Sequence, residues 1–185
     1  MMLSILICSL HSRSHLLAEL KAILQPQLTS DVELLIEVDN KEISTGAKRN
    51  ILLNRAQGKY IVFIDDDDMV NENYVDRILA ACAFDSDCIA INGKITTNGM
   101  NEIAWRLSKN YENITIKENG KDIYLRKTNH IAPVKRELAL KAMFPNISNG
   151  EDKAYSEALN PYLKTETIIY EPMYHYRFLT TNKEY

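Results

Sequence analysis

The first third of the chain alternates short apolar runs with helical segments, and this alternation constrains the fold more than any other feature. Residues 16–24 place leucines and isoleucines at helical spacing, and residues 44–56 form a second helical segment that ends before Gly58. Strands that alternate with helices pair in parallel through right-handed crossovers. The sequence therefore predicts an α/β fold, with a Rossmann-like, mainly parallel sheet flanked by helices. The three strands predicted here are residues 3–8, 32–38 and 60–64.

The pattern is weaker after residue 92. Asn98-Gly99 and Asn119-Gly120 are hairpin-type turns, so we expect residues 93–130 to be irregular or antiparallel. The other predicted elements are helices near residues 73–84, 135–143 and 152–160, and strands near residues 87–91, 114–117, 122–126 and 165–170.

Length and charge exclude several classes of protein. The chain has 185 residues, and 22 lysines and arginines against 25 aspartates and glutamates give a net charge of −3. The basic residues are scattered and form no cationic stripe, so we expect no nucleic-acid partner. The chain has neither the ~20 apolar residues of a transmembrane segment nor the basic start of a signal peptide, so we expect a cytoplasmic protein. Without repeats or linkers, we expect one compact domain over residues 1–185, with residues 1–92 and 93–185 as its halves.

Four consecutive aspartates, residues 65–68, directly follow the third predicted strand. Adjacent carboxylates repel one another, and neutralising them, by raised pKa values or by a bound cation, costs less at the carboxyl end of a strand than inside a core. In extended backbone, Asp65 and Asp67 point to the same side and can share one ion. Hard oxygen ligands favour Mg²⁺ or Mn²⁺, and the carboxyl ends of strands in open α/β sheets bind ligands. The simpler alternative is a solvated acidic turn that caps the following helix.

Charged residues also follow the second predicted strand. Asp39 ends that strand at the same edge of the sheet, although an aspartate there is often only a turn former. Lys48 and Arg49 open the next helix, where two cations and a helix N-terminus favour a diphosphate. A solvated basic helix face explains the same two residues.

The spacing of these motifs resembles that of family-2 glycosyltransferases with a GT-A fold. The opening residues 5–13 are similar to the family's first strand and loop, with Cys8 in place of the usual proline. The resemblance continues through the second half and covers nearly the whole chain. The matching motifs are Arg49-Asn50, Ala56-x-Gly58, the Asp65-x-Asp67 (DxD) motif, Glu151-Asp152 and Tyr174-His-Tyr-Arg177.

The resemblance implies transfer of a sugar from a nucleotide-diphosphate sugar, with a UDP-sugar as the first guess, to a hydroxyl of a carbohydrate or other acceptor. Asp152 is the implied catalytic base, beside Glu151, and one direct displacement would invert the anomeric carbon. The implied ligands of Mn²⁺ or Mg²⁺ are Asp67, Asp65 and His175. The implied donor-binding residues are Ser9, Leu10, His11, Asp39, Lys48, Arg49, Asp65, Asp66 and Arg177, and the candidates for stacking on an acceptor sugar are Trp105, Tyr111 and His130.

Two other functions fit parts of the sequence. The apolar strand before Asp65-x-Asp67 also fits a haloacid-dehalogenase-like phosphatase, although that motif normally follows the first strand. The chain also fits a nucleotide-sugar binding module without turnover, which would have no use for a base at Asp152. On the residues alone, Glu151 and Asp152 can cap a helix, and His175 and Arg177 can lie on the exposed face of a strand.

Overall fold

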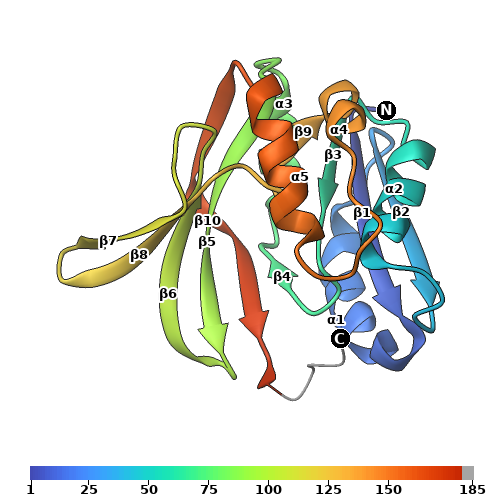
Figure 1. Cartoon of the computed structure of the whole chain (residues 1–185), viewed down its shortest axis with the longest axis horizontal. Coiled ribbons are helices and arrows are strands. Elements are labelled where there is room, and N and C mark those ends of the chain that lie inside the picture. Colours follow the sequence, from blue (N-terminus) through green and yellow to red (C-terminus); the bar gives the residue numbers. More distant parts are fainter. Residues whose placement is uncertain (181–185) are drawn as a thin grey trace.

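The computed structural model describes residues 1–180, in which ten strands form one mixed sheet with helices on both faces (Figure 1). The strand order is β2-β1-β3-β9-β5-β6-β8-β7, and β10 pairs with β5 and β4. No helix within these residues is long and apolar enough to cross a membrane. The elements form the expected α/β architecture.

The predicted strand-helix alternation opens the fold. β1 pairs in parallel with β2 on one side and with β3 on the other, and α1 and α2 make the crossovers. The carboxyl ends of these three strands therefore meet at one edge of the sheet, where ligands bind in folds of this kind. The bounds are β1 Leu3–Leu10, α1 Ser14–Leu24, β2 Val32–Asp39, α2 Thr45–Arg55 and β3 Tyr60–Phe63.

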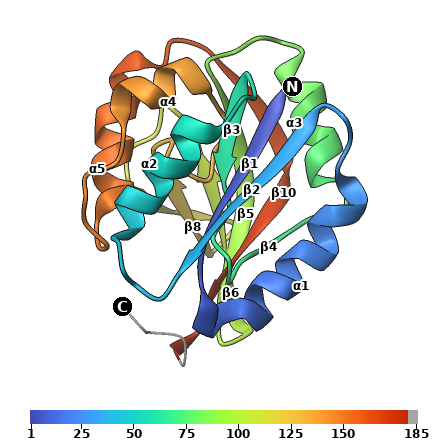
Figure 2. The same ribbon diagram turned by 90° about the vertical axis from the view of Figure 1, so that its right-hand side faces the viewer.

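Alternate side chains of the central strands face two separate cores. Ile5 of β1 and Val62 of β3 pack on the side of α1 and α3 (Tyr74–Cys82), whereas Leu6 packs on the side of α2. Figure 2 shows α1 and α3 on one side of the sheet and the other three helices on the opposite side. Burial on both faces explains why the central strands are continuous apolar runs. The remaining helices are α4 Arg136–Ala142 and α5 Glu151–Leu159.

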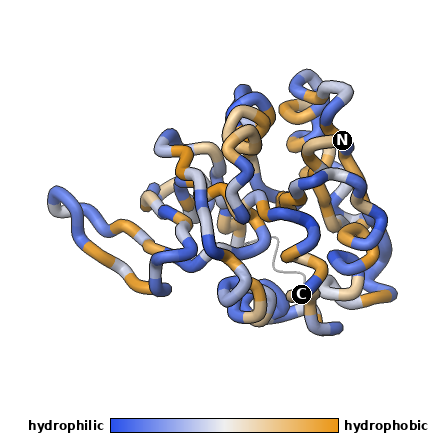
Figure 3. Tube along the Cα trace, turned by 90° about the horizontal axis from the view of Figure 1, so that it is seen from above, coloured by the Kyte–Doolittle hydropathy of each residue, from blue (hydrophilic) through white to orange (hydrophobic). Residues whose placement is uncertain are grey.

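The second half is antiparallel in large part, and it is more regular than the sequence indicates. β5 continues beyond the predicted strand and turns at Asn98-Gly99 into β6, which was not predicted because its first half is largely exposed. β7 and β8 form a hairpin that projects from the body of the molecule (Figure 1) and alternates hydrophilic with hydrophobic positions (Figure 3). The bounds are β5 Cys88–Thr97, β6 Met100–Leu107, β7 Ile114–Glu118 and β8 Lys121–Arg126.

The last strand, β10 (Glu166–Phe178), is about twice as long as the predicted strand of residues 165–170. It pairs in parallel with β5, with irregular register near Pro172, and it also pairs with β4. This extension brings the end of β10 to the acidic run that follows β3. The remaining elements are β4 Met69–Val70, β9 Val134–Lys135 and the 3₁₀ turns η1 His11–Arg13, η2 Gln25–Gln27 and η3 Asn160–Tyr162.

Candidate functional site

The acidic run forms a turn instead of extending β3. The strand ends at Phe63, and the N–H of Asp68 donates to the carbonyl of Asp65 at 3.1 Å. The extended backbone expected for residues 65–68 is therefore wrong, although Asp65 and Asp67 still line one pocket. Asp65 lines two adjoining pockets, a narrow one of about 420 Å³ and a wide one of about 800 Å³. Asp66 and Asp67 line the narrow pocket, and Asp68 lines the wide one.

Asp65 is paired with a buried arginine. Nη2 of Arg49 donates to Oδ1 of Asp65 at 2.9 Å, and Nε2 of His130 lies 3.2 Å from Oδ2. Burial favours the neutral acid, but His130 and Arg49 outweigh it and hold the pKa of Asp65 well below its usual range. The guanidinium of Arg49 lies over the rings of Phe63 and Phe144, 5.7 and 5.3 Å from their centroids. Asp65 is therefore an ionised, fixed carboxylate where the two pockets meet.

Arg13 contacts the next two carboxylates. Its Nη2 lies 3.0 Å from Oδ1 of Asp66 and also contacts the carboxylate of Asp67. The hydroxyl of Ser9 donates to Asp66 at 2.6 Å. Burial raises the pKa of Asp66 to about 6, and it raises the pKa of Asp67 as well. Sequence reasoning missed Arg13, although its position just after β1, next to the carboxyl end of β3, was a usable signal.

Asp68 ties the acidic turn to β10. The hydroxyl of Tyr174 donates to Asp68 at 2.7 Å, and the backbone N–H of Arg177 donates to it at 2.7 Å. Nε of Arg177 donates to the carbonyl of Asp67 at 2.6 Å. Burial, together with the charges of Asp65 and Asp67, raises the pKa of Asp68 well above its usual range. Tyr174 is a second residue that the sequence did not single out for this role.

The narrow pocket lies between the end of β1, the start of α2 and the acidic turn. Its three arginines, Arg13, Arg49 and Arg177, each keep a buried nitrogen without a hydrogen-bond partner among residues 1–180. That of Arg49, Nη1, has only an ion-pair contact of 3.4 Å with Oε1 of Glu151. Unused guanidinium donors suit a ligand with many anionic oxygens, such as a diphosphate. The cations that line this pocket are Arg13, Lys41, Lys48, Arg49 and Arg177.

The predicted donor-binding residues divide into two groups. Ser9, Leu10 and Lys48 line the narrow pocket together with the arginines and aspartates described above. Asp39 lies behind Lys48, whose ammonium is 2.5 Å from Oδ1 of Asp39 and 3.2 Å from the carbonyl of Ser9. His11 is exposed and lines neither pocket, because the 3₁₀ turn that begins there directs its side chain to solvent.

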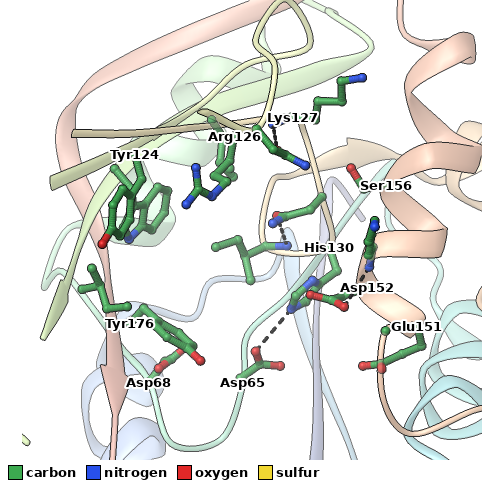
Figure 4. A pocket seen from close by; sticks show the side chains of 18 of the residues that line it. Asp65, Asp68, Tyr124, Arg126, Lys127, His130, Glu151, Asp152, Ser156 and Tyr176 are labelled. Atoms are coloured by element: carbon green, nitrogen blue, oxygen red, sulfur yellow. Dashed lines mark hydrogen bonds and ion pairs between the residues drawn. The ribbon is translucent and has the colours of Figure 1, made fainter. Parts of the chain in front are cut away.

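The wide pocket contains the Glu-Asp pair at the start of α5. Asp152 is half-buried and lines only this pocket, whereas Glu151 is buried and lines both. Oε1 of Glu151 lies 3.4 Å from Nη1 of Arg49, and burial raises the pKa of Glu151. Figure 4 shows both carboxylates at the same end of the wide pocket as Asp65. The two pockets therefore meet at a cluster of charged side chains from three different segments.

His175 is not part of this cluster. Its Nε2 lies 2.8 Å from the hydroxyl of Thr96, and it lines neither pocket. Successive side chains of a strand point to opposite sides, so when Tyr174 faces the acidic turn, His175 faces away. Within residues 1–180 no three His, Cys, Asp or Glu side chains are grouped to hold a metal ion. Asp65 and Asp67 both line the narrow pocket, and two carboxylates suit Mg²⁺ or Mn²⁺ when substrate phosphates complete the ligands.

Two of the three candidates for stacking on an acceptor line the wide pocket. Trp105 is buried against Tyr174, with ring centroids 5.9 Å apart in an edge contact, and His130 is held by Asp65. Tyr111 does not line the pocket, whereas Tyr124 and Tyr176, which were not predicted, do. Aromatic side chains therefore line the wide pocket, but only two of them are among those expected.

Residues 11–142 match the family model of glycosyl transferase family 2. The chain belongs to this family. The phosphatase alternative is therefore wrong. No curated protein matches this family-2 chain.

Solved structures of S. aureus TarS share the fold. One TarS structure has a TM-score of 0.73 at 16% sequence identity, covering 96% of this chain and 37% of that one. TarS 1–349 in complex with UDP-GlcNAc gives a TM-score of 0.73 at 16% identity, over 96% of this chain and 58% of that one. TarS 1–349 in complex with UDP gives a TM-score of 0.71 at 17% identity, over 96% of this chain and 60% of that one. The family-2 chain thus spans less than two thirds of these structures, and the match confirms its GT-A-type fold.

Proposed function

We propose that the chain transfers a sugar from a nucleotide-diphosphate sugar to an acceptor hydroxyl. The nucleotide diphosphate would occupy the narrow pocket and the acceptor the wide one. The observation that carries this proposal is that the two pockets share Arg49, Asp65 and Glu151 along their boundary. A sugar attached to a diphosphate on one side of this boundary would face an acceptor on the other. UDP is the first nucleotide to test, because TarS 1–349 forms complexes with UDP and UDP-GlcNAc.

The cations of the narrow pocket would bind the diphosphate and stabilise it as it leaves. Arg13 and Arg177 have unused hydrogen-bond donors, and fixed donors aimed at developing negative charge lower the barrier without reorganising during the reaction. Ser9 and Leu10, at the end of β1, would hold the nucleoside. Asp39 would act indirectly, by fixing the ammonium of Lys48. In this proposal residues 1–92 supply most of the donor site, and the second half supplies most of the acceptor site.

A divalent cation fits the narrow pocket on the chemistry of its donors. Asp67 and Asp65 would hold Mn²⁺ or Mg²⁺ together with the phosphate oxygens. Bound there, the ion supplies Lewis-acid stabilisation of the negative charge on the departing diphosphate. Arg13 contacts the same carboxylate of Asp67, so the guanidinium and a metal ion compete for it.

Asp152 would act as the general base. Its carboxylate accepts the proton of the acceptor hydroxyl while the hydroxyl oxygen forms a bond to the anomeric carbon and the bond to the diphosphate breaks. Attack from the face opposite the leaving group inverts the configuration. A positioned base contributes ~10² to 10⁴ in rate. Glu151 pairs with Arg49 and would hold this arginine at the boundary between the pockets. It would not take the proton.

Donor hydrolysis tests this function without knowledge of the acceptor. The protein is incubated with Mn²⁺ and a panel of UDP-sugars, and UDP release is measured. Proton NMR then identifies which anomer of the free sugar forms first, before the two anomers equilibrate. We expect an α-linked donor to release the β-sugar, and Asp152→Asn to lower the rate by about 10² to 10⁴ with unchanged UDP affinity. Glu157→Gln, on the exposed face of the same helix, is the matched control and should retain the wild-type rate.

Two results would contradict the proposal. Release of the α-sugar would exclude direct displacement. UDP binding without UDP release from any donor would favour the binding module.

A further inference from the structure

The wide pocket has all its carboxylates at one end, where Arg49 pairs with Asp65 and Glu151, and further cations at the other. Figure 4 shows four carboxylates, Asp65, Asp68, Glu151 and Asp152, at one end, and Tyr124, Arg126 and Lys127 at the other. The acidic end adjoins the narrow pocket, and the basic end is formed by the base of the β7–β8 hairpin and the segment that follows it. A ligand that spans the pocket would therefore meet acids at one end and cations at the other.

Arg126 differs from the other cations of this region, because it has no acidic partner. Arg106 of β6 pairs with Glu118 at 2.6 Å, and Lys127 pairs with Glu112 at 2.9 Å. Within the described part of the chain, no carboxylate lies within 4.0 Å of the guanidinium of Arg126. Its positive charge is thus not balanced by a neighbouring side chain.

The guanidinium of Arg126 is nevertheless held in place. Its Nη1 donates to the carbonyl of Ile114 at 2.9 Å and to that of Leu125 at 2.8 Å. The group also lies over the ring of Tyr124, 4.7 Å from the centroid. Nε and Nη2 make no hydrogen bond to any residue from 1 to 180. One edge of the guanidinium is therefore anchored, and the other has donors to spare for a carboxylate or phosphate.

We propose that Arg126, with Lys127 beside it, binds an anionic group of the acceptor. This inference rests on the proposed function, since it assigns the wide pocket to the acceptor. The acceptor would carry a phosphate or a carboxylate at a distance from the hydroxyl that receives the sugar. Arg126 attracts such a group to the end of the pocket away from Asp152, so its charge favours one orientation of the acceptor, with the receiving hydroxyl at the base. Arg126 is in this way a specificity-determining residue.

Paired small-molecule probes test this site directly. Methyl β-glucuronide is compared with neutral methyl β-glucoside, and glycerol 3-phosphate with glycerol, by titration into ¹⁵N-labelled full chain followed by NMR. We expect the anionic member of at least one pair to bind about tenfold or more tightly than its neutral partner. The pair with the larger difference shows whether the group is a carboxylate or a phosphate. Arg126→Gln should abolish the difference, and Arg126→Lys should retain part of it.

Arg106→Gln is the matched control, because it removes the same charge from the same sheet but lines neither pocket. The inference would be overturned if the wild type bound both members of both pairs equally. It would also be overturned if Arg106→Gln lost the preference for the anionic probe as completely as Arg126→Gln. Should Arg126→Gln fail to fold, the wild type still decides: raising NaCl from about 50 to about 500 mM must weaken only the anionic probes.

UDP binding is measured on the same samples and should be unchanged in Arg126→Gln. Anion binding without UDP binding would contradict the proposed function but leave this site standing. UDP binding without discrimination between the probes would contradict this inference alone.

Discussion

The four consecutive aspartates lie in three different environments along one turn. Arg49 and His130 keep Asp65 ionised, whereas burial favours the neutral form of Asp68. Asp66 and Asp67 share one guanidinium, that of Arg13. The run is therefore a set of separate sites and not a uniform acidic patch.

Asp66 should make stability depend on pH. Its pKa in the folded protein is raised to about 6 by burial, whereas an unfolded aspartate has a pKa near 3.9. The folded state then binds the proton more tightly, so this group lowers the free energy of unfolding as pH rises from about 4 to about 6. In the wild type this group should lower the free energy of unfolding by about 1–3 kcal/mol over that range, and Asp66→Asn should lack this decrease. Urea denaturation at several pH values measures it.

Asp76→Asn is the control for this experiment, since Asp76 is exposed on α3. The control should keep the wild-type pH profile. The explanation fails if the wild type and Asp66→Asn change in parallel with pH.

Arg13→Gln should strengthen binding of Mn²⁺ alone. The substitution removes the guanidinium that contacts Asp66 and Asp67 and leaves two adjacent carboxylates without a cation. We expect the Mn²⁺ affinity to rise about tenfold, which corresponds to about 1.4 kcal/mol. Titration of Mn²⁺ followed by electron paramagnetic resonance measures it, with Arg55→Gln, an exposed arginine at the end of α2, as the control. Weaker Mn²⁺ binding in Arg13→Gln would show that Asp67, which Arg13 contacts, does not hold the ion.

At the scale of elements, the start of α2 is locked to the loop that precedes α5. The side-chain amide of Asn50 donates to the carbonyl of Phe144 at 2.8 Å, and its oxygen accepts from the N–H of Phe144 at 2.9 Å. The N–H of Gly46 donates to the carbonyl of Ile147 at 3.0 Å. These contacts position Arg49 on α2 relative to Glu151 on α5, which together form the boundary between the two pockets.

Gly46→Ala should destabilise the protein although alanine is the better helix former. A Cβ at residue 46 would lie 1.9 Å from the carbonyl oxygen of Pro145, so the loop must move. Alanine gains ~1 kcal/mol of helix propensity, and overpacking of this kind costs ~1–3 kcal/mol, so we expect a net loss of about 1 kcal/mol. Urea denaturation measures the loss. Asn54→Ala, on the exposed part of the same helix, should be at least as stable as the wild type, and a similar gain in Gly46→Ala would contradict the clash.

Sequence patterns predicted the elements whose side chains face a core, and they failed where few side chains are buried. The runs that became β1, β2 and β3 are apolar and were found, but β6 was missed because its first three side chains are exposed. Whether His175 faces the acidic turn depends on the side of β10 on which it lies, and the register between β10 and β5 is irregular just before it. A hydrophobic pattern in the sequence does not show which side that is. Arg13 and Tyr174 reach the acidic turn only through the arrangement of neighbouring strands.

At the scale of the whole molecule, the sheet places two pockets on either side of one charged boundary. The narrow pocket lies at the carboxyl ends of the parallel strands, and the antiparallel second half forms most of the wide one. β10 joins the two halves, because it pairs with β5 along its length and holds Asp68 through Tyr174 and Arg177. This arrangement suits a reaction between two bound substrates better than binding of one ligand.

In the proposed function, the narrow pocket binds a nucleoside diphosphate together with a metal ion. Isothermal titration of UDP, with and without Mn²⁺, tests it most directly on the wild type, Asp67→Ala and the control Asp76→Ala. We predict saturable UDP binding that Mn²⁺ strengthens about tenfold or more in the wild type and the control, a gain that Asp67→Ala loses. Absence of UDP binding to the wild type in the presence of Mn²⁺, or an equal gain from Mn²⁺ in Asp67→Ala, would contradict a metal-assisted diphosphate site in this pocket.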